Sequence, residues 1–311
     1  MKQFSYTKSP ELSSKIALIE SLRSDILLKA LSPSHEMELQ WNTVLDRIYY
    51  SFLYKGNTVT KEHIASLLTP AGQKKVSPQD KQILKYKSAL DYIHYEWLVS
   101  EESITKETIT TLYQIGFNGK LRGQENEIKK ILDYVQVNPE QPIVQAAIAQ
   151  CLLLDLSPFS EENERFANLV FCLFTYKYGY DFRRMLDPEE YFYQTLFRYN
   201  EAKSNFSKTS NITKWIEYVT EGAVFQLNKV INNFNSLKNN VRDNQYVLEL
   251  NDRQKQILSI LDQPGLKVSN KDLQDMFKVS QITASRDLSK MANYGLIIPI
   301  GKGRSTYYTK I

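Results

Sequence analysis

The sequence predicts a mainly α-helical protein that ends in a small domain of mixed helices and strands. Apolar residues recur at helical spacing through most of residues 1–240, and the one strand pattern there is a candidate hairpin near Gly119–Ile128. Glycine and proline cluster between the apolar runs, in "TPAGQKK", "GFNGKLRGQ" and "VNPEQP", where they indicate turns. With 311 residues, the chain is long enough for a large core and a second, smaller one.

Composition indicates a soluble, cytoplasmic protein. The chain is 42% hydrophobic and 24% charged, and no apolar run approaches the roughly 20 residues that span a bilayer. The polar start "MKQFSYTKSPELSSK" does not resemble a secretory signal. Cys151 and Cys172 stand in apolar runs without metal-ligand spacing, so we expect them to be reduced core residues. Three scattered histidines predict no metal site.

The formal net charge of +4 is concentrated near the C-terminus. Residues 251–311 contain ten Lys and Arg against five Asp and Glu, whereas residues 1–250 contain 29 against 30. A small basic domain is typical of proteins that bind nucleic acid.

Four helices are predicted in the first half of the chain. Residues 11–31, 37–54 and 141–156 have apolar side chains at helical spacing. Residues 104–117 follow the same pattern, and Thr105 is the predicted N-cap of that helix. Threonine is a typical N-cap, and an acidic residue in the first turn supports a helix start there.

Residues 211–241 predict one or two amphipathic helices. Their apolar residues form a short heptad stripe of Val224, Leu227, Ile231 and Phe234. We expect this stripe to pack against the main domain, and a dimer interface is the alternative. The asparagine-rich segment that follows predicts a linker at 241–250.

Three short helices and two strands are predicted for residues 251–311. The predicted N-caps are Asn251, either Ser269 or Asn270, and Ser280, and Gly295 is expected to end the third helix. The apolar spacing of Ala284, Leu288 and Met291 predicts that these side chains of the third helix are buried. The opposite face is then expected to point outward, and it carries Gln281, Ile282, Ser285 and Arg286. The strands "LIIPI" and "TYYTKI" flank the glycine-rich "GKGRS".

This order describes a winged helix-turn-helix, a domain that binds DNA by placing one helix in the major groove. The stretch "VSQITASRDLSKMANYGLIIPIGKGRSTYY" resembles the winged helices of transcriptional regulators. A basic hairpin tip can reach phosphates or the minor groove. The predicted DNA contacts are Ser280, Gln281, Thr283, Ser285, Arg286, Lys302, Arg304 and Ser305. A winged helix that binds protein is the alternative.

The stretch "LSPFSEENERFANLV", residues 156–170, has the frame of a phosphate-handling motif on a loop that leads into a helix. Together with "GFNGKLRGQEN" before it and "GYDFRRMLDPEEYFYQ" after it, it resembles the Fic (Fic/Doc) family, whose signature is H-P-F-x-D/E-G-N-G-R-x-x-R. The resemblance spans about residues 40–311, because one architecture of that family also ends in a winged helix.

The resemblance implies transfer of AMP from ATP to a protein hydroxyl. In this reaction the motif histidine is the general base and the acidic residue holds Mg²⁺, while the glycine amides and the arginines bind phosphate. The matching residues are Pro158, Phe159, Glu161, Asn163 and Arg165. The departures are Ser157 at the histidine position, Glu162 and Glu164 at the glycine positions, and Asn168 at the second arginine position.

These departures argue against AMP transfer. A serine hydroxyl does not take up a proton near neutral pH, so Ser157 cannot replace the imidazole base. Each glutamate adds a negative charge beside a polyphosphate, which at about 4 Å costs from ~1 kcal/mol in water to ~4 kcal/mol near a protein surface. Loss of glycine also removes easy access to positive φ.

We therefore expect no catalytic residue in this motif and no cofactor. ATP and Mg²⁺ are implied only if the chain is a divergent nucleotidyltransferase that uses Glu161, Asn163 and Arg165. His94, among aromatic residues in "DYIHYEW", is expected to be a packed residue and not a substitute base.

Residues 49–68 resemble the family's inhibitory helix, whose pattern is S/T-x-x-x-E-G/N. Ser51 and Gly56 match, and Lys55 stands at the glutamate position, which in the family pairs with the motif's second arginine. One hypothesis pairs Lys55 with Glu162 or Glu164. The alternative is a solvated lysine at a helix end.

The predicted domains are an N-terminal helical region at 1–95, a Fic-like core at 96–240, the linker, and a winged helix at 251–311. The leading hypothesis is a DNA-binding regulator with a catalytically degenerate Fic-like domain, and the alternative is a divergent AMP transferase. DNA is the predicted partner. A homodimer and a protein bound in the Fic-like groove stay open, and we expect no membrane contact.

Overall fold

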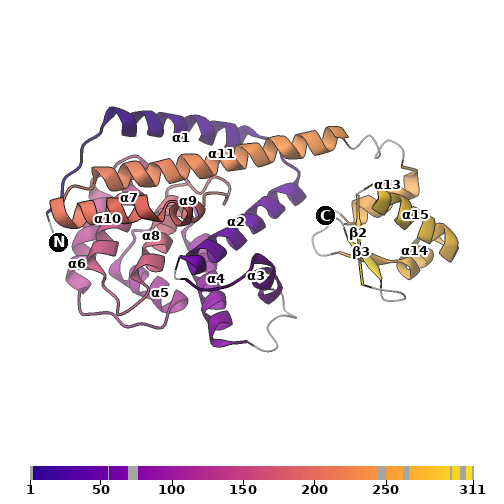
Figure 1. The fold of residues 1–311 in the computed structure, drawn as a ribbon, viewed down its shortest axis with the longest axis horizontal. Coiled ribbons are helices and arrows are strands. Elements are labelled where there is room, and N and C mark those ends of the chain that lie inside the picture. Colours follow the sequence, from indigo (N-terminus) through magenta and orange to yellow (C-terminus); the bar gives the residue numbers. More distant parts are fainter. Residues whose placement is uncertain are drawn as a thin grey trace. The chain divides into compact units, whose positions relative to one another are not determined.

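The computed structural model describes residues 3–54, 56–68, 76–243, 250–261, 266–294, 296–301 and 306–309, without the side chains of Ser34 and residues 236–243. It is mainly helical and has a three-stranded antiparallel sheet near the C-terminus, which confirms the predicted fold class (Figure 1). Among the helices in these ranges, none is both long enough and apolar enough to cross a membrane.

The first eleven helices are α1 (Pro10–Leu28), α2 (Pro33–Leu53), α3 (Lys61–Leu67), α4 (Pro78–Trp97), α5 (Lys106–Gly116), α6 (Glu125–Val137), α7 (Pro142–Leu156), α8 (Asn163–Lys177), α9 (Glu189–Gln194), α10 (Leu196–Thr209) and α11 (Thr213–Asp243). They are followed by α13 (Asp252–Leu261), β1 (Val268–Ser269), α14 (Asn270–Phe277), α15 (Gln281–Asn293), β2 (Ile298–Ile300) and β3 (Tyr307–Thr309).

The chain divides into two compact units. The first comprises Met1–Ala30 and Glu38–Asn232, and the second comprises Leu31–Met37 and Asn233–Ile311. Each unit has a hydrophobic core of its own.

Helices α7 and α8 form the centre of the first unit (Figure 1). Every residue of α7 from Ile143 to Leu154 is buried, and α8 is nearly as enclosed. A helix that is apolar on all sides is stable only inside a core. The buried polar side chain of Gln145 is accommodated by a hydrogen bond, since its Nε2 donates to the Val135 carbonyl at 2.6 Å. The loop between these two helices therefore starts and ends on a rigid support.

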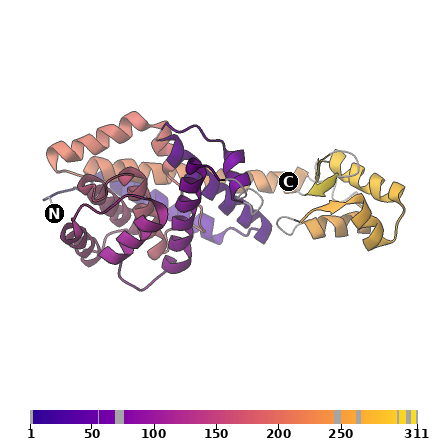
Figure 2. The same ribbon diagram turned by 90° about the horizontal axis from the view of Figure 1, so that it is seen from below.

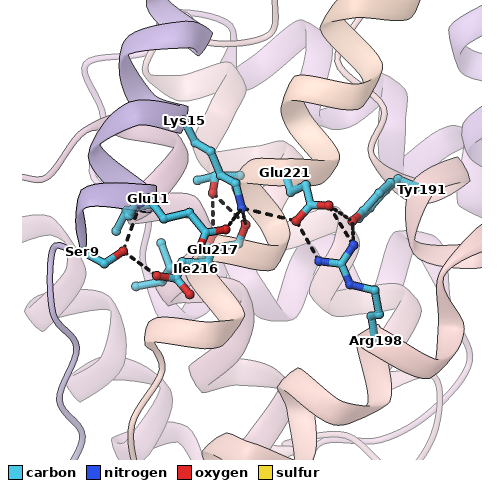
Figure 3. A network of polar contacts seen from close by, with 10 residues as sticks. Ser9, Glu11, Lys15, Tyr191, Arg198, Ile216, Glu217 and Glu221 are labelled. Atoms are coloured by element: carbon cyan, nitrogen blue, oxygen red, sulfur yellow. Dashed lines mark hydrogen bonds and ion pairs between the residues drawn. The ribbon is translucent and has the colours of Figure 1, made fainter.

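Helix α1 lies alongside α11 and is fastened to it by a polar network (Figures 1 and 3). Figure 3 shows Lys15 and Arg198 approaching Glu221 from opposite sides. Lys15 Nζ lies 3.3 Å from one Glu221 oxygen, and Arg198 forms two hydrogen bonds of 2.7 and 2.8 Å with the carboxylate. The Tyr191 hydroxyl also donates to Glu221, at 2.6 Å. One carboxylate thus joins helices α1, α9 and α10 to α11.

In the second unit the N-caps agree with the sequence. Asn251 Oδ1 accepts from the amide of Gln254 at 2.9 Å, and Ser269 and Ser280 cap α14 and α15 through their side chains. The predicted inward face of α15 is fully buried: Ala284, Leu288 and Met291. Gly295 lies outside the described residues.

The small sheet has the strand order β1-β3-β2, and Figure 2 shows helices of the yellow C-terminal part of the chain beside it. Ile298 pairs with Thr309 and Ile300 with Tyr307, as expected for the two predicted strands. Strand β1 was not predicted. Its two residues pair with Tyr307 and Tyr308 and carry no periodic signal of their own.

The structure corrects the predicted hairpin and the start of the predicted linker. The hairpin expected near Gly119–Ile128 is not formed: Leu121 makes a single antiparallel bridge with Phe159, and helix α6 already begins at Glu125. The buried residues of α6 at helical spacing (Ile128, Ile131, Leu132 and Val135) explain why helix prevails there. Residues 211–241 were expected to form one or two helices. They form one, α11, which continues to Asp243 and so includes the first residues of the predicted linker.

Candidate functional site

The loop between α7 and α8 begins at Ser157, which ends α7 in a left-handed conformation with φ +46°. Its hydroxyl donates a hydrogen bond of 2.8 Å to the carbonyl of Leu154, and its amide bonds the carbonyl of Leu153. The side chain at the expected base position therefore turns back onto its own helix.

A pair of reciprocal hydrogen bonds closes this loop. The amide of Phe159 donates to Asn163 Oδ1 at 3.0 Å, and Asn163 Nδ2 donates to the Phe159 carbonyl at 2.8 Å. The Phe159 ring stacks on Tyr113 with centroids 3.6 Å apart, and the Tyr113 hydroxyl donates to the Glu161 carbonyl at 2.9 Å. The asparagine and phenylalanine that match the family pattern thus serve to hold the loop in shape.

Residues 119–122 lie against the outer side of the loop. The amide of Arg122 donates to the Pro158 carbonyl at 2.8 Å, and the amide of Ser160 donates to the Lys120 carbonyl at 2.9 Å. The segment predicted as a hairpin is therefore attached to the motif by hydrogen bonds, although it does not form a hairpin.

Glu162 stands where the family pattern has glycine, yet its backbone keeps a left-handed conformation with φ +60°. Such a conformation costs a residue with a Cβ roughly 1–2 kcal/mol. Losing glycine at this position therefore makes the positive φ costly but does not prevent it. Glu161, the residue at the acid position, is exposed.

Arg165 is a core residue, with 3% of its surface exposed. Its guanidinium carbon lies 4.0 Å from the ring centroid of Phe52 and 4.7 Å from that of Tyr86. Nη1 reaches Glu162 at the long distance of 3.5 Å, while Nε and Nη2 have no hydrogen-bond partner. Burial lowers the pKa of this guanidinium.

The two remaining polar positions have partners of their own. Glu164 Oε1 lies 2.5 Å from Lys203 Nζ on α10. Asn168, at the second arginine position, accepts a hydrogen bond of 2.9 Å from Gln150 Nε2. The sequence did not indicate Lys203 as part of this site, since it follows Glu164 by 39 residues and belongs to no motif.

A small pocket lies between this site and the end of α2. It is lined by Tyr50, Ser51, Tyr54, Glu164, Arg165, Asn168, Glu189, Phe192 and Tyr199. Its volume is about 10 Å³, about the space of one water molecule. Pockets for nucleotide-sized ligands measure roughly 300 Å³ or more. The residues present therefore do not fit ATP as they stand.

The segment that resembles the inhibitory helix lines this pocket with Tyr50, Ser51 and Tyr54, and the Ser51 hydroxyl donates to the Ile48 carbonyl at 2.9 Å. Gly56 has φ +75°. Lys55 lies outside the described residues, so its pairing with Glu162 or Glu164 stays a prediction. His94 lines a different cavity with Arg47, Tyr176 and Arg184.

The second candidate surface is the outward face of α15. Gln281, Ile282, Ser285 and Arg286 are exposed as predicted, and Thr283 is half-buried with its amide on the Ser280 cap. The one acidic residue of this helix, Asp287, is only 4% exposed and turns inward. There it accepts hydrogen bonds from Arg253 Nε at 2.6 Å and Gln254 Nε2 at 2.7 Å. The charged groups on the outer face are therefore cationic.

The predicted hairpin contacts Lys302, Arg304 and Ser305 lie outside the described residues. The strands that flank them, β2 and β3, pair in register.

The fold is that of Fic family proteins. A Fic family protein from Desulfovibrio desulfuricans G20 matches 100% of this chain and 98% of its own, with a TM-score of 0.67 at 15% identity. Fic-1 from C. elegans matches 71% of each chain, with a TM-score of 0.56 at 17% identity. A Fic domain containing signaling protein from Bacteroides thetaiotaomicron VPI-5482 matches 71% of this chain and 97% of its own, with a TM-score of 0.55 at 16% identity.

The C-terminal part is defined more closely. Residues 253–303 match the DeoR-like helix-turn-helix domain. No curated protein matches the chain in sequence. The chain thus combines a Fic family fold with a DeoR-like helix-turn-helix.

Proposed function

We propose that this protein is a DNA-binding regulator in which the Fic-like site does not transfer AMP. The observation that carries the proposal is the outer face of α15, which presents Arg286 and Lys290 while its one acid, Asp287, is buried against α13. A helix with polar and cationic outward side chains fits the major groove, where it can contact base edges and phosphates. The match to the DeoR-like helix-turn-helix supports the same assignment.

The Fic-like site supports the second half of the proposal. Ser157 stands at the position of the family's base histidine, and its hydroxyl cannot act as a base near neutral pH. That hydroxyl is also hydrogen-bonded to the Leu154 carbonyl of its own helix. The pocket beside Arg165 is too small for a nucleotide, and Glu164 adds a carboxylate to its wall. We assign this domain the role of a scaffold.

The test is a mobility-shift assay on DNA fragments recovered by genomic footprinting with the full chain. Arg286→Ala should lower affinity about 5- to 150-fold, since a cationic contact to a base or phosphate is worth about 1–3 kcal/mol, and it should reduce the dependence on salt by about one charge. Lys214→Ala, an exposed lysine of the first unit, is the matched control and should bind as the parent does. Equal affinity of the parent and both variants would reject the proposal.

One observation favours a second candidate, a divergent nucleotidyltransferase. The buried guanidinium of Arg165 has two nitrogens without a hydrogen-bond partner, and a phosphate would satisfy them. Titration calorimetry with ATP and Mg²⁺ separates the two functions. Micromolar binding that disappears in Arg165→Met would favour the transferase, and an absence of heat would favour the scaffold.

A further inference from the structure

An exposed isoleucine stands in the first turn of α15. Ile282 is 65% exposed, the largest exposed fraction among the large hydrophobic residues described in the second unit's helix-turn-helix and sheet. It is absent from the hydrophobic core of this unit and from the residues packed against that core. The fold of the unit therefore does not require an apolar side chain at this position.

The neighbours of Ile282 are polar or cationic. Gln281 precedes it, and Ser285 and Arg286 follow on the same outward face. Farther along the helix the surface hollows into an open groove of about 370 Å³, lined by Ser285, Arg286, Ser289, Lys290, Asn293 and Tyr294. The face thus has an apolar residue at its N-terminal end and a polar, cationic groove toward its C-terminal end.

These two parts suit different parts of a DNA duplex. In helix-turn-helix proteins the N-terminal residues of the recognition helix contact base edges. The thymine C5-methyl is the apolar group that a base pair presents in the major groove, and a glutamine can bond adenine through N6 and N7. The cationic groove, in contrast, suits phosphates.

We infer that Ile282 selects a thymine by contact with its C5-methyl group, so that the recognised DNA contains an A·T pair opposite the first turn of α15. This inference rests on the proposed DNA binding and specifies what is bound. It makes Ile282 a specificity-determining residue, with Gln281 placed to bond the adenine of that or the adjacent pair.

The experiment begins with selection of bound sequences from random DNA by the full chain. Each thymine of the selected site is then replaced by uracil, which removes the methyl group alone. At one thymine of the site the replacement should weaken binding about fourfold, the equivalent of about 0.8 kcal/mol for one buried methyl-sized group. In Ile282→Ala the same replacement should have no effect, because the contact is already lost.

Met276→Ala is the control, since Met276 is an exposed apolar residue of α14, outside α15. It should keep the uracil effect in full. Circular dichroism confirms that each variant is folded. A flat uracil scan with tight binding, or an equal fourfold loss in Ile282→Ala, would overturn the inference and leave the proposed function standing. Failure to bind any DNA would overturn both.

Discussion

The guanidinium of Arg165 lies 4.0 Å from the ring centroid of Phe52, deep in the first unit. Two of its nitrogens have no hydrogen-bond partner, and its nearest carboxylate, Glu162, is 3.5 Å away. The residue that would bind phosphate in the Fic pattern is thus a nearly unpaired cation in an aromatic core.

A buried charge without a close partner is more costly than an apolar side chain of similar volume. We predict that Arg165→Met leaves the free energy of unfolding unchanged or raises it by about 1 kcal/mol. Urea denaturation followed by tryptophan fluorescence measures this, since all three tryptophans belong to the first unit.

Arg47→Met is the matched control for this prediction. Arg47 is equally buried, but its Nε lies 3.3 Å from Glu189 and 3.9 Å from Asp187. Removing it leaves two buried carboxylates without their cation, which should cost about 3–5 kcal/mol. Similar losses in both variants would contradict the distinction we draw between a paired and an unpaired arginine.

The left-handed backbone at Glu162 gives a second prediction. Glu162→Gly should be more stable than Glu162→Ala by about 1 kcal/mol, because glycine adopts φ +60° without steric cost. At Glu161, which is not among the residues with positive φ, the order should reverse, with alanine favoured. Thermal denaturation of the four variants tests both statements, and the same order at both positions would refute them.

Local patterns in the sequence predicted the C-terminal unit well and the Fic-like site less well. The caps Ser269 and Ser280 and the buried face of Ala284 and Leu288 depend on residues within one helix, so spacing alone identifies them. The glycines at 119 and 123 indicate a turn from local sequence too, and they led to the prediction of a hairpin. The helical spacing of the apolar residues in α6 prevails there instead.

The interior of the site depends on contacts between residues far apart in the chain. Glu164 pairs with Lys203 from another helix, and Arg165 is enclosed by rings from α2 and α4. No periodicity in the sequence encodes such contacts. The motif therefore identified the residues of the site, whereas their burial and pairing could be found only in the fold.

The buried carboxylate of Asp287 leads to a third prediction. Asp287→Ala removes the acceptor for Gln254 Nε2, which is itself buried, and for Arg253 Nε. A buried donor left without a partner costs about 1–3 kcal/mol, so we expect a loss of about 2 kcal/mol in the stability of the second unit. Hydrogen exchange of the α15 amides measures it.

Asp275→Ala, at an exposed position of α14, is the control for Asp287→Ala. It should change exchange by no more than about 0.5 kcal/mol, as is usual for surface substitutions. Unchanged α15 protection in Asp287→Ala would show that this network does not hold the helix in place.

The fourth prediction concerns acid stability and the carboxylate of Glu221. Hydrogen bonds from Arg198, followed by those from Tyr191 and Lys15, lower its pKa from an ordinary value near 4.5 to about 2. Because the folded form binds the proton less readily than the unfolded form, this carboxylate stabilises the fold at any pH above about 4.5. That contribution is lost as the pH falls from about 4.5 toward 2.

Glu221→Gln should therefore be less stable than the parent at pH 7. The difference in the free energy of unfolding should shrink steadily below pH 4.5, because Glu221 of the parent binds a proton on unfolding there and glutamine does not. Urea denaturation between pH 2.5 and 7 measures both curves. Glu11→Gln is the control variant, because it removes an exposed partner of the same Lys15. Surface pairs of this kind are worth about 0–1 kcal/mol, so its stability should stay within about 1 kcal/mol of the parent's. A constant gap between parent and Glu221→Gln across this range would mean that Glu221 does not carry the acid dependence.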